Sequence, residues 1–187
     1  VQTCALPICK EYGNQPFRMT MITNHDENSW HGTLREKFGD AHQTFATFIF
    51  TAYGIPMMYS GQEVGLDKRL KFFEKDSIDW SDPQQLQPFY KKLNELKQNN
   101  QALWAGEYGG APQRINADSS IYAFRRSKGT SSVIGIMNFS DKPQKLILTD
   151  HGSAGNYTDY FTGKSFLLSK DKPLELAPWQ YLIFVVS

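Results

Sequence analysis

The order of secondary-structure signals along the first hundred residues constrains the fold most. A short strand-like run over residues 18–22 ends in a polar loop, and apolar residues then recur at helical spacing from Gly39 to Gly54. A second short strand is expected over residues 57–59, directly after Pro56, which cannot continue a helix. Strand, helix and strand in this order predict a βαβ unit with parallel strands.

The rest of the chain changes its pattern. A second helix is expected from about Pro83 to residue 98, with Asp82 as its start signal and Pro88 able to move the first turn later. After a boundary within residues 100–118, short β-rich runs alternate with turn clusters. These runs cover residues 120–126, 133–139, 145–148, 157–161, 166–168 and 181–186. Such even spacing predicts an antiparallel sandwich or barrel.

Composition argues against some classes of partner. The chain has 20 basic and 19 acidic residues, and a net charge of +1 does not suit a nucleic acid or a charged membrane surface. No apolar run reaches the roughly 20 residues of a membrane-spanning helix. The first residues lack the pattern of a signal peptide, and localisation stays open between secreted, periplasmic and cytoplasmic. Aromatic residues are 14% of the chain, a high share that supplies buried area or stacking surfaces.

The first nine residues do not look like natural protein sequence. Residues 1–8 resemble the in-frame translation of a common sequencing-adapter oligonucleotide, and a last adapter base would suit the codon of Cys9. We therefore expect residues 1–9 to be an artefact and exclude them from the fold. Cys4 and Cys9 both fall in this segment, so neither a disulfide nor a cysteine metal site is expected. The chain would then be the carboxyl-terminal piece of a longer protein.

A carboxylate and an imidazole stand side by side just after the first strand. Asn24, His25 and Asp26 begin the polar loop, and Trp30 follows within it. An acid can accept hydrogen bonds from sugar hydroxyls or face a developing positive charge, an imidazole can donate, and an indole can stack on a ring. The alternative is a hydrogen-bonded turn, because Asn and Asp are favoured in loops. Glu63 follows the second strand, so both acids are expected at the strand ends where α/β proteins bind ligands.

Four segments together resemble one enzyme family. Residues 21–26 look like the Asn-His-Asp motif at barrel strand seven of the α-amylase family of glycoside hydrolases. Residues 54–63 are similar to that family's strand-eight segment, and residues 89–103 to its last barrel helix. Residues 121–140 look like the opening strands of its C-terminal β-domain. The resemblance covers residues 10–187 in the family's order.

This resemblance implies the overall architecture and activity. Residues 10–103 would be the last part of a (β/α)8 TIM barrel, an α/β fragment, and residues 104–187 an all-β antiparallel sandwich domain. The family cleaves α-glucosidic bonds of α-glucans or maltooligosaccharides by a retaining mechanism, with a carboxylate nucleophile and a carboxylic acid that protonates the leaving oxygen. Both groups would lie upstream, on strands four and five, so this chain alone is expected to be inactive. A broken barrel exposes strand edges, so residues 104–187 are expected to behave better alone than residues 10–187.

The resemblance also implies roles for single residues. Asp26 matches the family's third acid, which holds sugar hydroxyls in the cleavage subsite and strengthens those bonds as the ring flattens towards an oxocarbenium-like state. His25 matches the neighbouring donor to the same sugar. Asn24 belongs to this substrate-binding motif but is expected to shape the turn more than to touch the ligand, and Trp30 is a candidate stacking platform. No metal ligand or cofactor is expected in this chain, and calcium, common among relatives, would bind mainly upstream.

The role of Glu63 stays open. Adjacent parallel strands lie about 4.8 Å apart. Asp26 and Glu63 could therefore approach the roughly 5–5.5 Å separation of a retaining carboxylate pair. The resemblance favours a structural or rim role for Glu63, because it places the catalytic pair upstream.

Two other functions are open as well. The chain could be a carbohydrate-binding β-module preceded by helices. The aromatic residues that bind the carbohydrate would then be Tyr122, Tyr157, Tyr160 or Trp179. It could also be a non-catalytic barrel relative retained for protein contacts. Most of these aromatics are expected in the core of the sandwich, since aromatics are enriched in half-buried strands. The sequence therefore favours the enzyme over both alternatives.

Overall fold

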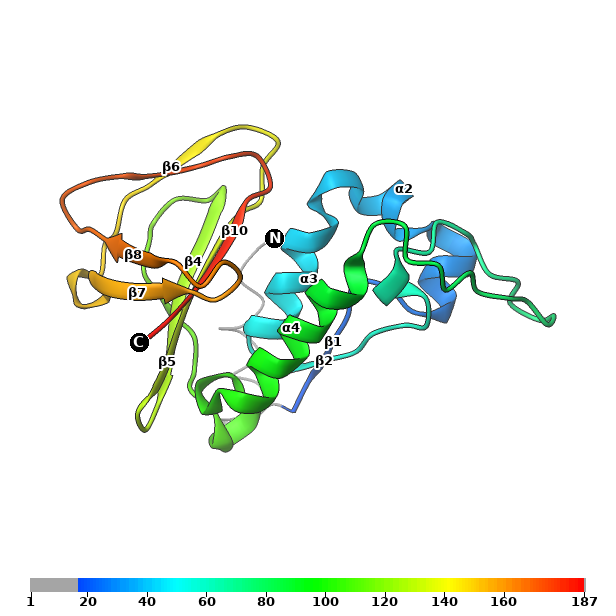
Figure 1. The fold of residues 1–187 in the computed structure, drawn as a ribbon, viewed down its shortest axis with the longest axis horizontal. Coiled ribbons are helices and arrows are strands. Elements are labelled where there is room, and N and C mark those ends of the chain that lie inside the picture. Colours follow the sequence, from blue (N-terminus) through cyan, green and yellow to red (C-terminus); the bar gives the residue numbers. More distant parts are fainter. Residues whose placement is uncertain (1–16, 187) are drawn as a thin grey trace.

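Two short parallel strands and the helix between them open the structure. The computed structural model describes residues 17–186 (Figure 1). Strand β1 (Met19–Thr20) pairs in parallel with β2 (Ile55–Pro56), and helix α3 (His42–Thr51) lies between them in the chain. The expected βαβ unit is therefore confirmed.

The second strand begins two residues earlier than the sequence suggested. The amide of Ile55 donates to the carbonyl of Arg18 at 2.7 Å, and Met57 makes the next bond to β1 at 2.8 Å. The nitrogen of Pro56 thus points away from β1, and its missing N–H removes no ladder bond. The predicted strand over residues 57–59 was wrong in position, because Pro56 was taken as a stop instead of as part of the strand.

Gly54 allows the end of α3 to meet β1 closely. Its φ is +139°, and a Cβ at this position would lie 2.8 Å from the carbonyl oxygen of Arg18. Only glycine suits such an approach. On the other side, Nζ of Lys97 donates to the carbonyl of Gly54 at 2.7 Å, which holds this turn against the last helix.

The segment between β1 and α3 is more helical than expected. It contains the π-helical turn η1 (Glu27–His31), helix α2 (Leu34–Phe38) and the 3-10 turn η2 (Gly39–Ala41). Helix α2 starts with a capping box. The Glu36 amide donates to the Thr33 hydroxyl at 3.2 Å, and the Thr33 amide donates to the Glu36 carboxylate at 2.7 Å. Thr33 followed three residues later by Glu36 is a sequence signal for the start of a helix, and α2 was not predicted from it.

The last helix, α4 (Leu86–Asn99), starts three residues later than the expected Pro83. Asp82 still marks the start, because its carboxylate accepts the amide protons of Leu86 and Gln87 at 2.7 and 3.0 Å. Helices α2, α3 and α4 share one apolar core with the segment after β1. That core consists of Ile22, Leu34, Ala46, Ile49, Phe50, Leu86, Phe89, Tyr90 and Leu93. It covers one face of the strand pair.

The other face of the strand pair is apolar and open. Thr20 points towards α3, where its hydroxyl donates to the carbonyl of Ile49 at 3.2 Å. Alternate residues point the opposite way, and Met19, Met21 and Ile55 are 62%, 42% and 45% exposed. Parallel strands are normally covered on both faces. This open apolar face is therefore unusual for a βαβ unit.

The carboxyl-terminal half consists of two packed antiparallel sheets. The large sheet has the strand order β3-β4-β5-β10-β7-β8, and β6 and β9 form the small one. The strands are β3 (Gln113–Arg114), β4 (Ile121–Lys128), β5 (Ser131–Asn138), β6 (Gln144–Leu146), β7 (Gly155–Asp159), β8 (Ser165–Leu168), β9 (Leu174–Leu176) and β10 (Tyr181–Val185). Their shared core includes Ile121, Ile134, Ile136, Leu146, Leu176 and Phe184. The antiparallel prediction is confirmed, while the short strands β3 and β9 were not predicted.

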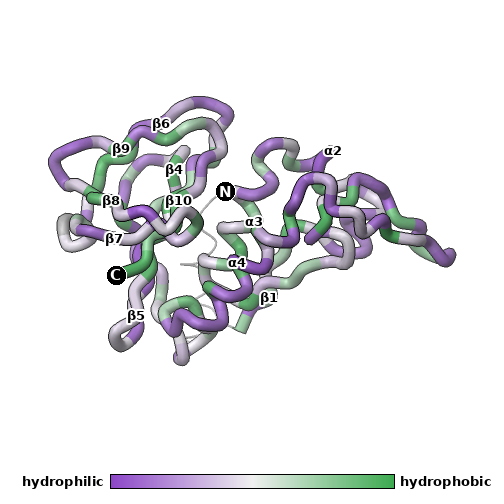
Figure 2. The backbone as a smooth tube through the Cα atoms, viewed as in Figure 1, coloured by the Kyte–Doolittle hydropathy of each residue, from purple (hydrophilic) through white to green (hydrophobic). Residues whose placement is uncertain are grey.

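Helices α3 and α4 lie against the second face of the large sheet (Figure 1). Phe48 of α3 and Leu96 of α4 share a cluster with Met137 of β5. Consecutive residues 133–138 of β5 are buried, because this strand is covered on both faces. Figure 2 shows hydrophobic stretches on α3, β9 and β10, and a mostly hydrophilic tip on the loop that precedes α4. The two halves of the chain are thus joined through a common apolar interface.

Some expectations concern residues that the structure does not describe. Residues 1–9, with both cysteines, lie outside the described residues, and so does the expected artefact. Within residues 17–186, the helices are all too short or too polar to span a lipid bilayer.

Candidate functional site

Asn24 holds the loop in which the candidate site lies. Its side-chain oxygen accepts the amide proton of Glu27 at 2.7 Å, and its carbonyl accepts that of Asn28 at 2.9 Å. The amide of Gly32 then donates to the carbonyl of Glu27 at 3.0 Å, which makes η1 a π-turn. Gly32 has a φ of +133°, a backbone conformation that suits glycine. These bonds give Asn24 a structural task, and its contact with a ligand stays a prediction.

His25 and Asp26 lie together just beyond the carboxyl end of β1. Nε2 of His25 is 3.6 Å from Oδ2 of Asp26, and the two side chains are 63% and 56% exposed. An exposed carboxylate beside a ring nitrogen can receive the hydroxyl groups of a sugar. A surface pair of this kind contributes little to folding. Both groups are therefore available to a ligand.

Three aromatic rings stand beside this pair. The ring centroid of Phe72 is 5.7 Å from that of His25 and 5.3 Å from that of Trp30. Phe73 lies 4.8 Å from Phe72 and 6.3 Å from Trp30. We call Trp30, Phe72 and Phe73 the aromatic cluster. Sequence reasoning found Trp30 but missed the phenylalanines, whose signal was an apolar pair inside a run of charged residues.

Asn28 fixes the loop that carries the two phenylalanines. Its buried side chain donates to the carbonyl of Lys68 at 3.1 Å and accepts the amide proton of Leu70 at 2.8 Å. The hydroxyl of Ser29 donates to the carbonyl of Leu70 at 2.7 Å. Side chains of η1 therefore hold the backbone of this distant loop, much as a neighbouring strand would.

Ion pairs surround the aromatic cluster without an excess of one sign. The hydrogen bond from Arg69 holds the pKa of Glu36 below its ordinary range. The hydrogen bond from Lys68 lowers the pKa of Asp76 to about 2. Since these charges are matched in pairs, the surroundings of the cluster suit a neutral ligand better than a polyanion.

The polar residues after β2 take part in holding the fold. The carboxylate of Glu63 accepts the amide proton of Gly61 at 2.9 Å. Gln62 is buried and donates to the hydroxyl of Tyr90 at 3.0 Å, and that hydroxyl lies 2.7 Å from Nε2 of His42. This arrangement favours the structural or rim role of Glu63 over membership of a catalytic pair.

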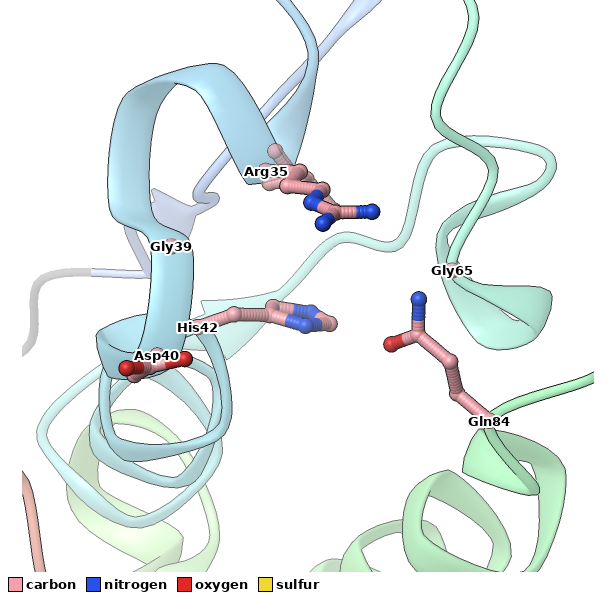
Figure 3. A pocket seen from close by; sticks show the side chains of 7 residues that line it. Arg35, Gly39, Asp40, His42, Gly65 and Gln84 are labelled. Atoms are coloured by element: carbon pink, nitrogen blue, oxygen red, sulfur yellow. The ribbon is translucent and has the colours of Figure 1, made fainter.

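A polar cavity of about 270 Å³ lies apart from the acid–imidazole pair. It opens between α2, the start of α3 and the residues before α4, and Arg35, Asp40, His42 and Gln84 supply its polar lining. Figure 3 shows the side chains of Arg35, His42 and Gln84 turned towards one another across it. None of the residues lining the cavity belongs to the aromatic cluster or to the pair beside it. The cavity is therefore a feature separate from the candidate site.

Metal ions in proteins are most often bound by clusters of His, Cys, Asp or Glu side chains. Within residues 17–186, the structure brings together no group of three or more His, Cys, Asp or Glu side chains that could hold a metal ion. The position of a calcium site in the longer protein stays a prediction.

The tyrosines that a β-module would use are packed in the fold. The rings of Tyr122, Tyr157 and Tyr160 each contact a phenylalanine at centroid distances of 5.4, 6.1 and 5.7 Å. Trp179 is half-buried. The packing of the three tyrosines favours the core role expected for them, whereas Trp30, Phe72 and Phe73 are exposed beside His25.

Curated relatives of this chain are glucan-active enzymes. α-Amylase 2 of Dictyoglomus thermophilum is 27% identical over 181 residues, which is 90% of this chain and 29% of the relative. A cyclomaltodextrinase of Thermoanaerobacter pseudethanolicus is 29% identical over 106 residues, 55% of this chain and 18% of the relative. The chain thus spans less than a third of the length of these relatives. No protein-family model matches it.

Solved structures with the same fold come from the same group of enzymes. A maltogenic α-amylase from Thermotoga neapolitana has a TM-score of 0.77 at 16% identity, over 95% of this chain and 43% of its own. A cyclomaltodextrin glucanotransferase has a TM-score of 0.75 at 20% identity, over 96% of this chain and 38% of its own. At these identities the likeness shows the fold. The curated relatives and structural neighbours are α-amylase-family enzymes, which confirms the resemblance seen in the sequence.

Proposed function

We propose that this chain is the carboxyl-terminal part of an α-amylase-family enzyme that acts on α-glucosidic bonds of α-glucans or maltooligosaccharides by a retaining mechanism. The observation that carries the proposal is the exposed pair of His25 and Asp26 at the carboxyl end of β1, beside the aromatic cluster. A carboxylate, a hydrogen-bond donor and flat rings match a pyranose, which has hydroxyls at its rim and C–H groups on its faces. The names of the relatives support the glucan as substrate.

Asp26 has the role of transition-state stabiliser in this proposal. Its carboxylate accepts hydrogen bonds from the hydroxyls of the sugar at the cleaved bond and faces the positive charge that develops there. His25 donates to the same sugar, Trp30 offers a stacking surface, and Asn24 sets the turn that presents them. Because these contacts strengthen as the sugar ring flattens, they lower the barrier more than they raise substrate affinity.

The nucleophile and the acid/base belong to upstream strands of the barrel. The relatives are more than three times as long as the part that this chain matches, which leaves room for those strands. The open apolar face of β1 and β2 also supports a larger sheet, since Met19, Met21 and Ile55 would be covered inside a closed barrel. The chain alone is then inactive, and a calcium site of the intact enzyme belongs to that upstream part.

The test compares the intact gene product with the chain of 187 residues on a soluble α-glucan. Released reducing ends give the turnover, and the anomeric configuration of the first product, read by NMR, gives the stereochemistry. We expect the intact enzyme to release the α-anomer and the chain alone to release nothing. A β-anomer contradicts the retaining mechanism, and turnover by the chain alone contradicts the upstream position of the catalytic pair.

A further inference from the structure

The aromatic cluster exposes more apolar surface than the fold requires. Phe73 is 85% exposed, Trp30 55% and Phe72 38%, although the three rings are in mutual contact. Single exposed aromatics are ordinary, but several gathered in one place mark a binding surface. Phe73 in particular contributes little to the core. These rings are therefore placed for a ligand.

The cluster is held in shape before a ligand arrives. The two bonds from the buried side chain of Asn28 fix the loop backbone at Lys68 and Leu70. Further along, the amide of Lys71 donates to the carboxylate of Asp76 at 3.1 Å, which closes the turn that carries both phenylalanines. A surface that is already ordered loses little conformational entropy on binding.

The rim of the cluster points to a neutral, polyhydroxylated ligand. Nζ of Lys71 lies 2.7 Å from the carboxylate of Glu74, and Lys68 pairs with Asp76. Because these charges are paired, the cluster has no net positive electrostatic potential that would attract a nucleic acid or an anionic lipid surface. They do offer donors and acceptors around flat rings, which is the arrangement that a sugar chain needs.

We propose that the aromatic cluster binds the glucosyl units next to the one held by His25 and Asp26, so that the site selects long α-glucan chains over short ones. This inference rests on the proposed function. The ring centroids of His25, Phe72 and Phe73 follow one another at 5.7 and 4.8 Å, steps comparable to the spacing of successive glucosyl units along an α-glucan. A chain that leaves His25 therefore meets Phe72 and then Phe73, with Trp30 at its side.

The test measures chain-length preference in the intact enzyme. The readout is the ratio of kcat/KM for maltoheptaose to kcat/KM for maltotriose. We expect Phe73→Ala to lower this ratio about three- to tenfold, the range of a single aromatic contact. Phe73→Tyr keeps the ring and should keep the ratio. Trp80→Ala is the matched control, because Trp80 is 54% exposed on the same loop but outside the cluster, and it should leave the ratio unchanged.

An unchanged ratio in Phe73→Ala would overturn the inference, because the ring then does not touch the chain. A lower Tm in the same variant would show that another part of the enzyme covers the ring. If the intact enzyme turns over no α-glucan, the proposed function fails, and calorimetric titration of wild type and Phe73→Ala with maltoheptaose then tests the cluster. Weaker binding by Phe73→Ala still supports the aromatic cluster as a glucan site, and equal binding overturns it.

Discussion

His42 is buried at the start of α3, where its ring shares a hydrogen bond with the hydroxyl of Tyr90. Gln62 donates to the hydroxyl of Tyr90 at 3.0 Å, and this hydroxyl lies 2.7 Å from Nε2 of His42, to which it can donate a hydrogen bond when that nitrogen carries no proton. Burial disfavours the charged imidazolium and lowers the pKa of His42 from 6.5 to about 4. The fold therefore keeps this ring neutral, and with it the contact between Tyr90 and the turn after β2.

We expect this histidine to make the fold sensitive to acid. Above pH 6.5 the ring is neutral in the folded and unfolded chains, so its contribution is fully present. As the pH falls from 6.5 towards 4, only the unfolded chain takes up the proton, and stability declines. The difference between 6.5 and about 4 corresponds to about 3 kcal/mol. Urea unfolding at pH 7 and pH 4.5 measures it, and His42→Gln should show a smaller loss than wild type; equal losses would speak against this role.

Only part of the candidate site could be predicted from the sequence. Asn24, His25 and Asp26 could be placed at a strand end, because a short strand and a following polar run are adjacent in the sequence. Phe72 and Phe73 could not, since their position depends on bonds from the Asn28 side chain to a loop far along the chain. Local periodicity contains no information about such contacts.

Arg126 of β4 joins three elements from a fully buried position. Its guanidinium donates to the carbonyls of Ala52 at 2.6 Å and of Gly110 and Trp104 at 2.7 Å each. The carbonyl of Ala52 belongs to the end of α3, where unpaired carbonyls and the helix dipole attract a cation. Arg126 thus connects the helical half to the sandwich without an acidic partner in these bonds.

Replacing Arg126 should destabilise the whole chain. Arg126→Met keeps the apolar stem but leaves several buried carbonyls without a donor, and we expect a loss of about 3 kcal/mol or more. Arg125→Met is the matched control on the neighbouring position, where the side chain is 29% exposed, and should cost about 1 kcal/mol or less. Chemical denaturation of both variants gives the comparison. Similar losses in the two variants are incompatible with the joining role of Arg126.

The longest elements were predicted, and the shortest strands only in part. Helix α3 and strands β4 and β5 have enough turns or alternations for a periodic signal. Strands β3 and β9, of two and three residues, do not, and they form because β4 and β6 beside them offer partners. Strand β2 includes Pro56 and not the predicted residues 57–59. Its position is set by pairing with β1 and not by local propensity.

The two halves of the described chain pack on opposite faces of the large sheet, which is therefore buried on both sides. Phe124 and Met137 belong to the interface with α3 and α4, while Ile134 and Ile136 face the small sheet. The sequence suggested that residues 104–187 would behave better alone than a longer piece. The structure argues against this, since removal of the helices would expose an apolar sheet face.

We therefore expect residues 104–187 to self-associate when expressed alone. The exposed face should bind hydrophobic dyes and give aggregated material in size-exclusion chromatography. The chain from residue 17 onwards, which keeps α3 and α4, is the comparison. Monomeric elution and cooperative thermal unfolding of residues 104–187 would show that the helices are not needed to cover this sheet.

The role of Asp26 is the central claim for the intact enzyme, and kcat on a soluble α-glucan tests it most directly. Asp26→Asn keeps the shape but removes the charge, so kcat should fall by about 10²- to 10⁴-fold, with a much smaller effect on substrate binding. Glu63→Gln should cost about tenfold or less, because its carboxylate holds a turn. A Glu63→Gln variant without turnover beside an Asp26→Asn variant of nearly full activity would contradict the assignment.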